Sequence, residues 1–337
     1  MRTRDVLRVL LGLVAVAALG WFVWHADLPG VGRALVGLGG AAPVLLGPYL
    51  LVYLSDTLGW LFSFRQPLSL GFLNVLRIRW AGEAVNNVVP SAYLGGEAVR
   101  IYLLARRGVP PARSAPAAVV SKTVQTLGQV CCIALGGLAF VYLGVAPPIF
   151  QTAMLAVLIT GGLAIAGLFW IQRRGMFGFL LGVLRRLRWH PDWVERRQKD
   201  WRMFDHEVGT FYVTQRGRFL GAFVGYLGGW LLDALEIYLA AYLLNVSMNL
   251  PQAIGIETFV SVAKAMSIFI PAAVGVQDFS VVFLCRMAGV PDSFGFTYAV
   301  LRRAREVIFV LLGWVWLMLE GTAIKGLARR VRIAGSQ

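Results

Sequence analysis

The sequence is poor in the residues that most often carry chemistry. Only 15% of its 337 residues are charged, and it has three cysteines and three histidines. Cys131 and Cys132 are adjacent and Cys285 lies alone in an apolar segment, which argues against a disulfide framework. The histidines are scattered, and no pair of them has metal-ligand spacing. We therefore expect no metal site and no cofactor.

Catalytic motifs are missing as well. The chain has no Gly-x-Ser-x-Gly elbow, no His-Glu-x-x-His pair and no Gly-x-x-x-x-Gly-Lys loop for phosphate. Ser121 is adjacent to Lys122, but neighbouring residues on a helix point in different directions, so they are not a catalytic pair. The sequence predicts no catalytic residues and a protein that is not an enzyme.

Apolar residues dominate what is present. They make up 58% of the chain, and the mean hydropathy is +0.69, which is typical of an all-α integral membrane protein. Basic residues outnumber acidic ones by 32 to 17. They cluster beside apolar segments, a pattern that orients membrane proteins and attracts anionic lipid headgroups. We expect membrane lipids, and no nucleic acid, as partners.

About six segments are long and apolar enough to cross a membrane, and we read the chain as one polytopic domain, 1–337. A signal peptide is the alternative for the first of them, but its closing aromatic residues suit an uncleaved helix at an interface. Basic loops place both termini in the cytoplasm. The basic, Trp-bearing segment 172–218 predicts cytoplasmic interfacial helices. The predicted spans are 6–24, 41–64, 115–143, 150–171, 219–245 and 294–320.

Two further apolar segments, 68–105 and 251–288, contain helix-breaking residues. In the first, one half-helix is expected to end near Asn87 and the next to begin near Gly95, after Pro90. Broken helices at membrane depth survive where protein or a wet cavity satisfies their backbone. The charge of the flanking loops predicts two re-entrant elements, the first entering from the cytoplasm and the second from outside.

An internal repeat relates these two elements. A shift of 181 residues aligns two prolines and two Gly-Val-Pro triplets, and charged residues follow in register. With the opposite entry sides, this predicts an inverted repeat of units at about 41–143 and 219–320, as in many transporters. The aligned pairs are Pro90 with Pro271, Glu97 with Asp278, Lys122 with Arg303, and Gln125 with Glu306.

The repeat also suggests a binding site. Two aligned cations near the ends of two half-helices would hold an anionic group, because guanidinium groups and helix N-termini favour phosphate. The acids beside them either couple transport to protons or only neutralise their neighbours. For Asp56, Asp233 and Glu236, structural pairing and function are equally plausible. The candidate substrate-binding residues are Asn86, Asn87, Pro90, Gly95, Gly96, Glu97, Arg100, Lys122, Pro271, Gly275, Gln277, Asp278, Arg302, Arg303, Arg305 and Glu306.

The same motifs prompt a family comparison. Asn86-x-x-x-Pro90 with Gly95-Gly96-Glu97-Ala98-x-Arg100, and Ile270-Pro271-x-x-x-Gly275-Val276-Gln277-Asp278 with Arg302-Arg303-Ala304-Arg305-Glu306, resemble signatures of one membrane family. It is the flippase-like family related to the transmembrane half of lysylphosphatidylglycerol synthases, and the second signature resembles its hopanoid-associated branch. Asp278 stands where a Glu is expected, and no Gly directly follows Pro271.

The resemblance implies lipid handling in the cytoplasmic (inner) membrane of a bacterium. One hypothesis is a flippase that moves an anionic phospholipid or polyprenyl-linked lipid between leaflets. The alternative is a non-transporting membrane subunit that presents a lipid to a separate lipid-modifying or glycosylating enzyme. Access of a central cavity to both leaflets would separate the two hypotheses.

Overall fold

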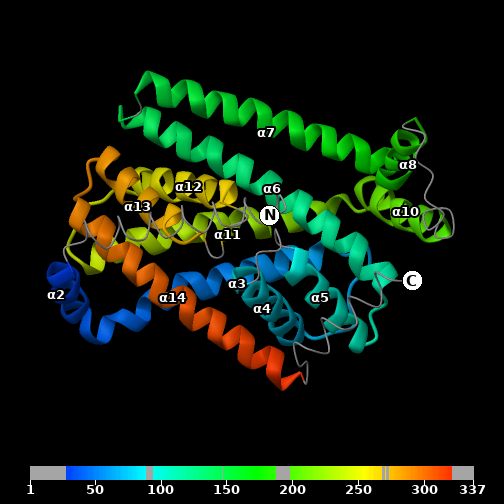
Figure 1. Ribbon diagram of the computed structural model, residues 1–337, viewed down its shortest axis with the longest axis horizontal. Coiled ribbons are helices and arrows are strands. Elements are labelled where there is room, and N and C mark those ends of the chain that lie inside the picture. Colours follow the sequence, from blue (N-terminus) through cyan, green and yellow to red (C-terminus); the bar gives the residue numbers. More distant parts are fainter. Residues whose placement is uncertain are drawn as a thin grey trace, which may run out of the picture.

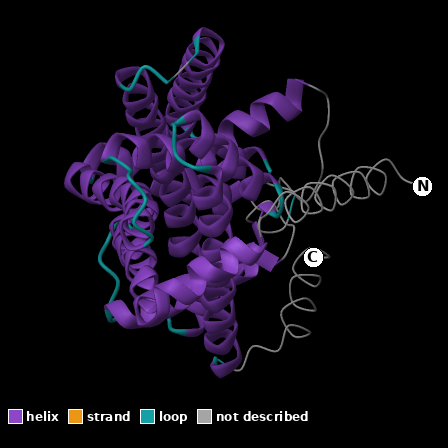
Figure 2. Cartoon of the chain, turned by 90° about the vertical axis from the view of Figure 1, so that its left-hand side faces the viewer, coloured by secondary structure: helices purple, strands orange, loops and turns teal. Residues whose placement is uncertain are grey.

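A computed structural model describes residues 28–88, 94–145, 147–186, 198–267, 270 and 273–320. These residues form helices joined by short loops, with no strand among them (Figure 2). The predicted all-α membrane fold is therefore confirmed. The predicted span 6–24, Pro90 and Pro271 lie outside the described residues.

Long helices form the framework of the structure. The short helices α2 (Leu28–Leu38) and η1 (Gly39–Leu45) lead into the first of them. Four described segments are long and apolar enough to cross a membrane: Val36–Phe62, Pro111–Tyr142, Pro148–Arg174 and Arg216–Leu243. The long helices are α3 (Leu46–Phe62), α6 (Pro111–Tyr142), α7 (Pro148–Arg174), α11 (Arg216–Leu243) and α14 (Asp292–Leu319).

Helix α14 corresponds to the predicted span 294–320 but is less apolar than those four. Its 28 residues give it a length of roughly 42 Å at 1.5 Å per residue, enough for a hydrocarbon core of about 30 Å. Its middle carries Arg302, Arg303, Arg305 and Glu306. A count of six spans remains a prediction.

Two helical hairpins occupy the predicted broken elements. The first consists of α4 (Phe72–Val88) and α5 (Leu94–Arg106), and the second of α12 (Leu250–Met266) and α13 (Val276–Met287). In the first hairpin, α4 ends and α5 begins within about a residue of the positions expected from the sequence. Figure 1 shows α12 and α13 towards one end of the long helices, and α4 and α5 towards the other.

The hairpins pack across the molecule. Helix α4 lies against α14, and α12 lies against α6, so each hairpin's first helix contacts the long helix that follows the other hairpin. At the centre, α3 and α11 pack along each other. Their approach requires glycine, because a Cβ on Gly225 would lie 2.7 Å from the backbone nitrogen of Gly59.

The described part of the basic segment contains α8 (Met176–Arg186) and α10 (Gln198–Thr214), at one end of the bundle. The Asp205 carboxylate accepts hydrogen bonds from the backbone nitrogens of Phe177 (3.0 Å) and Gly178 (2.9 Å), which holds the start of α8 against α10. Val208 and Phe211 are buried where α10 packs on α6 and α7. Helix α10 is thus anchored to the bundle on one face.

Candidate functional site

A polar cavity of about 310 Å³ lies where the two hairpins meet the long helices. Among the described residues, its ionisable lining comprises five cations and four carboxylates. The other polar side chains on its wall include Gln125, Gln129 and Ser261. The cations are Arg79, Lys122, Lys264, Arg302 and Arg305, and the carboxylates are Asp56, Glu83, Asp233 and Glu257.

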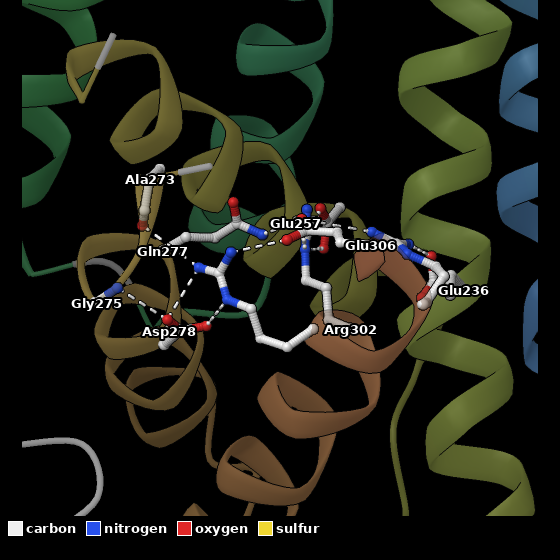
Figure 3. A network of polar contacts seen from close by, with 10 residues as sticks. Glu236, Glu257, Ala273, Gly275, Gln277, Asp278, Arg302 and Glu306 are labelled. Atoms are coloured by element: carbon white, nitrogen blue, oxygen red, sulfur yellow. Dashed lines mark hydrogen bonds and ion pairs between the residues drawn. The ribbon is translucent and has the colours of Figure 1, made fainter. Parts of the chain in front are cut away.

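One side of this cavity is supported by a network between α13 and α14 (Figure 3). Arg303 donates from Nε to Asp278 Oδ1 at 2.7 Å and from Nη1 to Glu306 Oε2 at 2.7 Å. Asp278 also accepts a hydrogen bond from the Gly275 backbone nitrogen at 2.9 Å, at the start of α13. Gln277 Nε2 donates to Glu306 at 3.1 Å. The network therefore fixes the first turn of α13 to α14.

A related network joins α5 to α6. Lys122 Nζ lies 3.2 Å from Glu97 Oε1 and donates to Gln125 Oε1 at 3.3 Å. Arg100 donates to Glu97 at 2.6 Å and to Glu83 at 2.7 Å, which ties α5 to α4 as well. Arg100 is completely enclosed, so its charge requires a carboxylate partner, and it contacts two.

The two networks share one pattern of contacts. Lys122 contacts Glu97 and Gln125, while Arg303 contacts Asp278 and Glu306. These are the residues that the 181-residue shift aligns. In each hairpin, a cation of the following long helix holds an acid in the first turn of the second short helix.

Other ion pairs tie the cavity wall together across helices. Arg302 of α14 lies 2.6 Å from Glu257 of α12, and both side chains are buried. Arg305 pairs with Glu236 of α11, and its guanidinium lies 3.5 Å from the centre of the Tyr49 ring. Arg79 of α4 pairs with Asp56 of α3. Buried cations in apolar surroundings need such partners.

The structure brings part of the predicted site together. Lys122, Arg302 and Arg305 line the cavity, whereas Arg100 and Arg303 lie outside its lining, within their ion pairs. The cations on the cavity wall therefore differ from the predicted set, which included Arg100 and Arg303. Glu97, Gln277, Asp278 and Glu306 also belong to the supporting networks.

Among the remaining predicted residues in the first hairpin, Asn86 and Gly96 hold its two helices together. Asn86 Oδ1 accepts a hydrogen bond from the Gly96 backbone nitrogen at 2.8 Å. Asn87 Nδ2 donates to the Glu83 carbonyl at 3.0 Å within its own helix, and Gly95 lies in the first turn of α5. A Cβ on Gly96 would overlap Asn86 and the Gly82 carbonyl, so only glycine fits this crossing.

Six charged residues on the wall were not predicted as site residues: Asp56, Arg79, Glu83, Asp233, Glu257 and Lys264. A signal for one of them was present, because Lys264 lies 181 positions after Glu83, the spacing of the repeat. Both of these residues line the cavity, one from each hairpin. Asp233, weighed from the sequence only as an intramembrane acid, lines it too.

Comparison with known proteins identifies a family. Residues 8–313 match the family model described as the lysylphosphatidylglycerol synthase TM region. No curated protein and no solved structure matches the chain.

Proposed function

The chain belongs to the family of the lysylphosphatidylglycerol synthase transmembrane region, and we propose that it moves a lipid with a phosphate-bearing headgroup between leaflets. Membership supports a multi-pass membrane protein with a lipid-related function. The finer proposal is a flippase for an anionic phospholipid or a polyprenyl-linked lipid. It acts without catalysis in a bacterial cytoplasmic membrane, with both termini in the cytoplasm.

The observation that carries the proposal is the cation-rich central cavity. A volume of about 310 Å³ suits a headgroup rather than acyl chains, which would stay in the surrounding lipid. Five cations line it, and Lys122, whose side chain is 38% exposed, meets the Glu97 carboxylate through a contact of 3.2 Å that a phosphate could replace. Cations around one space at membrane depth, where solvent screening is weak, favour a phosphate.

The packing of the hairpins supports a way to expose this cavity to each leaflet in turn. Helix α4 packs on α14 and α12 packs on α6, so each unit contributes one wall to the other. Rocking of two such units around a shared site is how many inverted-repeat transporters alternate access. A phosphate entering the cavity would compete with Glu97 for Lys122, which links headgroup binding to the contact between α5 and α6.

A second candidate function is a non-transporting subunit that presents a lipid to a separate enzyme. The segment 172–218 favours it, because its described part carries eight Lys or Arg against three Asp or Glu and so suits anionic lipid heads or an acidic partner. Such a subunit would bind the headgroup in the cavity but would not equilibrate it between leaflets.

Reconstitution in liposomes separates the two functions. Fluorescent phosphatidylglycerol and a fluorescent polyprenyl phosphate are incorporated, and dithionite quenching reports the fraction of probe that reaches the outer leaflet. We expect transport by the wild type and at least a roughly tenfold slower rate in Lys264→Gln, since one cation of the cavity is removed.

Lys199→Gln is the matched control, because Lys199 is an exposed residue of α10 and does not line the cavity. It should transport like the wild type. Equal rates in wild type, Lys264→Gln and Lys199→Gln would refute the cavity as the path. Binding of both lipids without any transport would favour the presenting subunit.

A further inference from the structure

A second cavity, of about 550 Å³, opens at the basic end of the bundle. It lies between the loop after α3, the start of α6 and the helix α10. Its lining shares no residue with the central cavity, so it is a separate site within the described chain. Pro116, Ala117, Val120 and Phe211 form a buried apolar wall.

The polar lining of this cavity carries an excess of positive charge. Arg65, Arg113, Arg202 and His206 lie along it with one carboxylate, Glu207. Glu207 is paired with Arg65 at 2.7 Å, so its charge is compensated within the described structure. The other arginines thus have no carboxylate among the described lining residues.

Arg113 is held in place by hydrogen bonds, whereas Arg202 and His206 are available to a ligand. Arg113 donates from Nη2 to the carbonyls of Gln66 (2.9 Å) and Pro67 (2.8 Å), which positions its guanidinium beside the loop. Arg202 and His206 are exposed and form no hydrogen bond or ion pair with any described residue. They lie one helical turn apart on α10, so both can reach one ligand.

We propose that this pocket binds a phosphate monoester or diester that carries a short apolar group. The phosphate would lie against Arg202, His206 and Arg113, since guanidinium groups offer paired donors that match phosphate oxygens. The apolar group would cover the exposed apolar lining residue Met203, which bare inorganic phosphate leaves open to water. A lipid headgroup and a soluble phosphate ester both have this chemistry. The site goes beyond the proposed transport because it uses none of the central cations.

Binding to the purified full-length protein in detergent tests this assignment. The probes are dihexanoyl phosphatidate as the lipid, hexyl phosphate as the soluble ester, inorganic phosphate, and uncharged dihexanoylglycerol. We expect the two esters to bind to the wild type. The double substitution Arg202→Gln/His206→Gln should weaken their affinity about tenfold or more. Lys199→Gln/Arg216→Gln removes exposed basic groups outside the pocket and should leave their affinity unchanged.

The apolar part is tested by Ala112→Phe, a substitution at an exposed lining residue that would fill the opening. It should weaken the binding of both esters. Tighter binding of phosphatidate would identify a lipid headgroup as the ligand, and tighter binding of hexyl phosphate would identify a soluble ester. Ester affinity that is unchanged in Arg202→Gln/His206→Gln would overturn the site. Inorganic phosphate binding as tightly as the esters, or dihexanoylglycerol binding equally well, would overturn the proposed ligand. Lys264→Gln should keep this pocket's ester affinity, so failure here is distinguishable from failure of transport.

Discussion

The two matching ion-pair networks differ in burial and geometry, and this difference predicts unequal contributions to stability. Arg303 donates to both oxygens of Asp278, at 2.7 and 2.9 Å, and the side chains of Arg303 and Asp278 are 23% and 3% exposed. Lys122 makes a single contact with Glu97, at 3.2 Å, and these two side chains are 38% and 13% exposed. A bidentate buried pair couples its partners more strongly than a solvated single contact.

The magnitudes follow from these two environments. Arg303→Gln leaves Asp278 and Glu306 without their shared cation, and removing one partner of a buried pair costs about 3–5 kcal/mol. We expect a coupling energy of about 2–3 kcal/mol between Arg303 and Asp278. For Lys122 and Glu97 we expect about 1 kcal/mol or less, because water reaches the lysine.

Two double-mutant cycles measure both couplings in the same protein. One uses Arg303→Gln and Asp278→Asn, and the other Lys122→Gln and Glu97→Gln, with unfolding followed in mixed micelles of mild detergent and dodecyl sulfate. In Asp278→Asn and Glu97→Gln, the neutral amide has the same size as the carboxylate that it replaces. Equal coupling energies in the two cycles, or a larger one for Lys122 and Glu97, would refute the argument from burial.

Three other predictions concern topology, packing and proton coupling. Single cysteines are placed at Ala41, Ala112, Asp200 and Asp292 in a background without native cysteine. With an impermeant thiol reagent, Ala41 and Asp292 should label from outside and Ala112 and Asp200 from inside. Labelling of Ala112 and Asp292 from the same side would contradict the inverted repeat. Gly96→Ala should destabilise by about 1–3 kcal/mol, since its Cβ overlaps Asn86 and a backbone carbonyl, whereas Gly217→Ala has open space and is the control. Glu306→Gln should remove any dependence of transport on a pH gradient if this acid carries the proton, and gradient-independent wild-type transport would exclude coupling.

Much of the fold could be predicted from local sequence signals. Helix α4 ends at Val88, where Asn87 was expected to be the end, and α5 begins at Leu94, next to the predicted Gly95. Proline and paired glycines act on the backbone within a few residues, so they mark breaks without knowledge of the tertiary structure. The repeat shift likewise aligned residues that make equivalent contacts in the structure.

The pairing of charges across helices could not be read in the same way. Arg302 contacts Glu257 on α12, and Arg305 contacts Glu236 on α11, although the two arginines are close in sequence. Which face of α14 meets which neighbour depends on how side chains interlock between helices, and this is not a local property of the sequence. Arg79 was missed for the same reason, since its partner Asp56 lies on another helix.

Burial also decides which central cations are suited to bind a headgroup. The side chains of Arg302 and Glu257 are each 5% exposed, so separating them would leave two desolvated charges at high cost. Lys122 contributes a solvated ammonium, and exchanging its contact with Glu97 for a phosphate costs far less. We therefore expect the arginines of α14 to hold the cavity in shape while lysines at its wall exchange partners. On this view, replacing Lys122 by Gln should weaken headgroup binding more than it weakens folding, and replacing Arg302 by Gln should do the reverse.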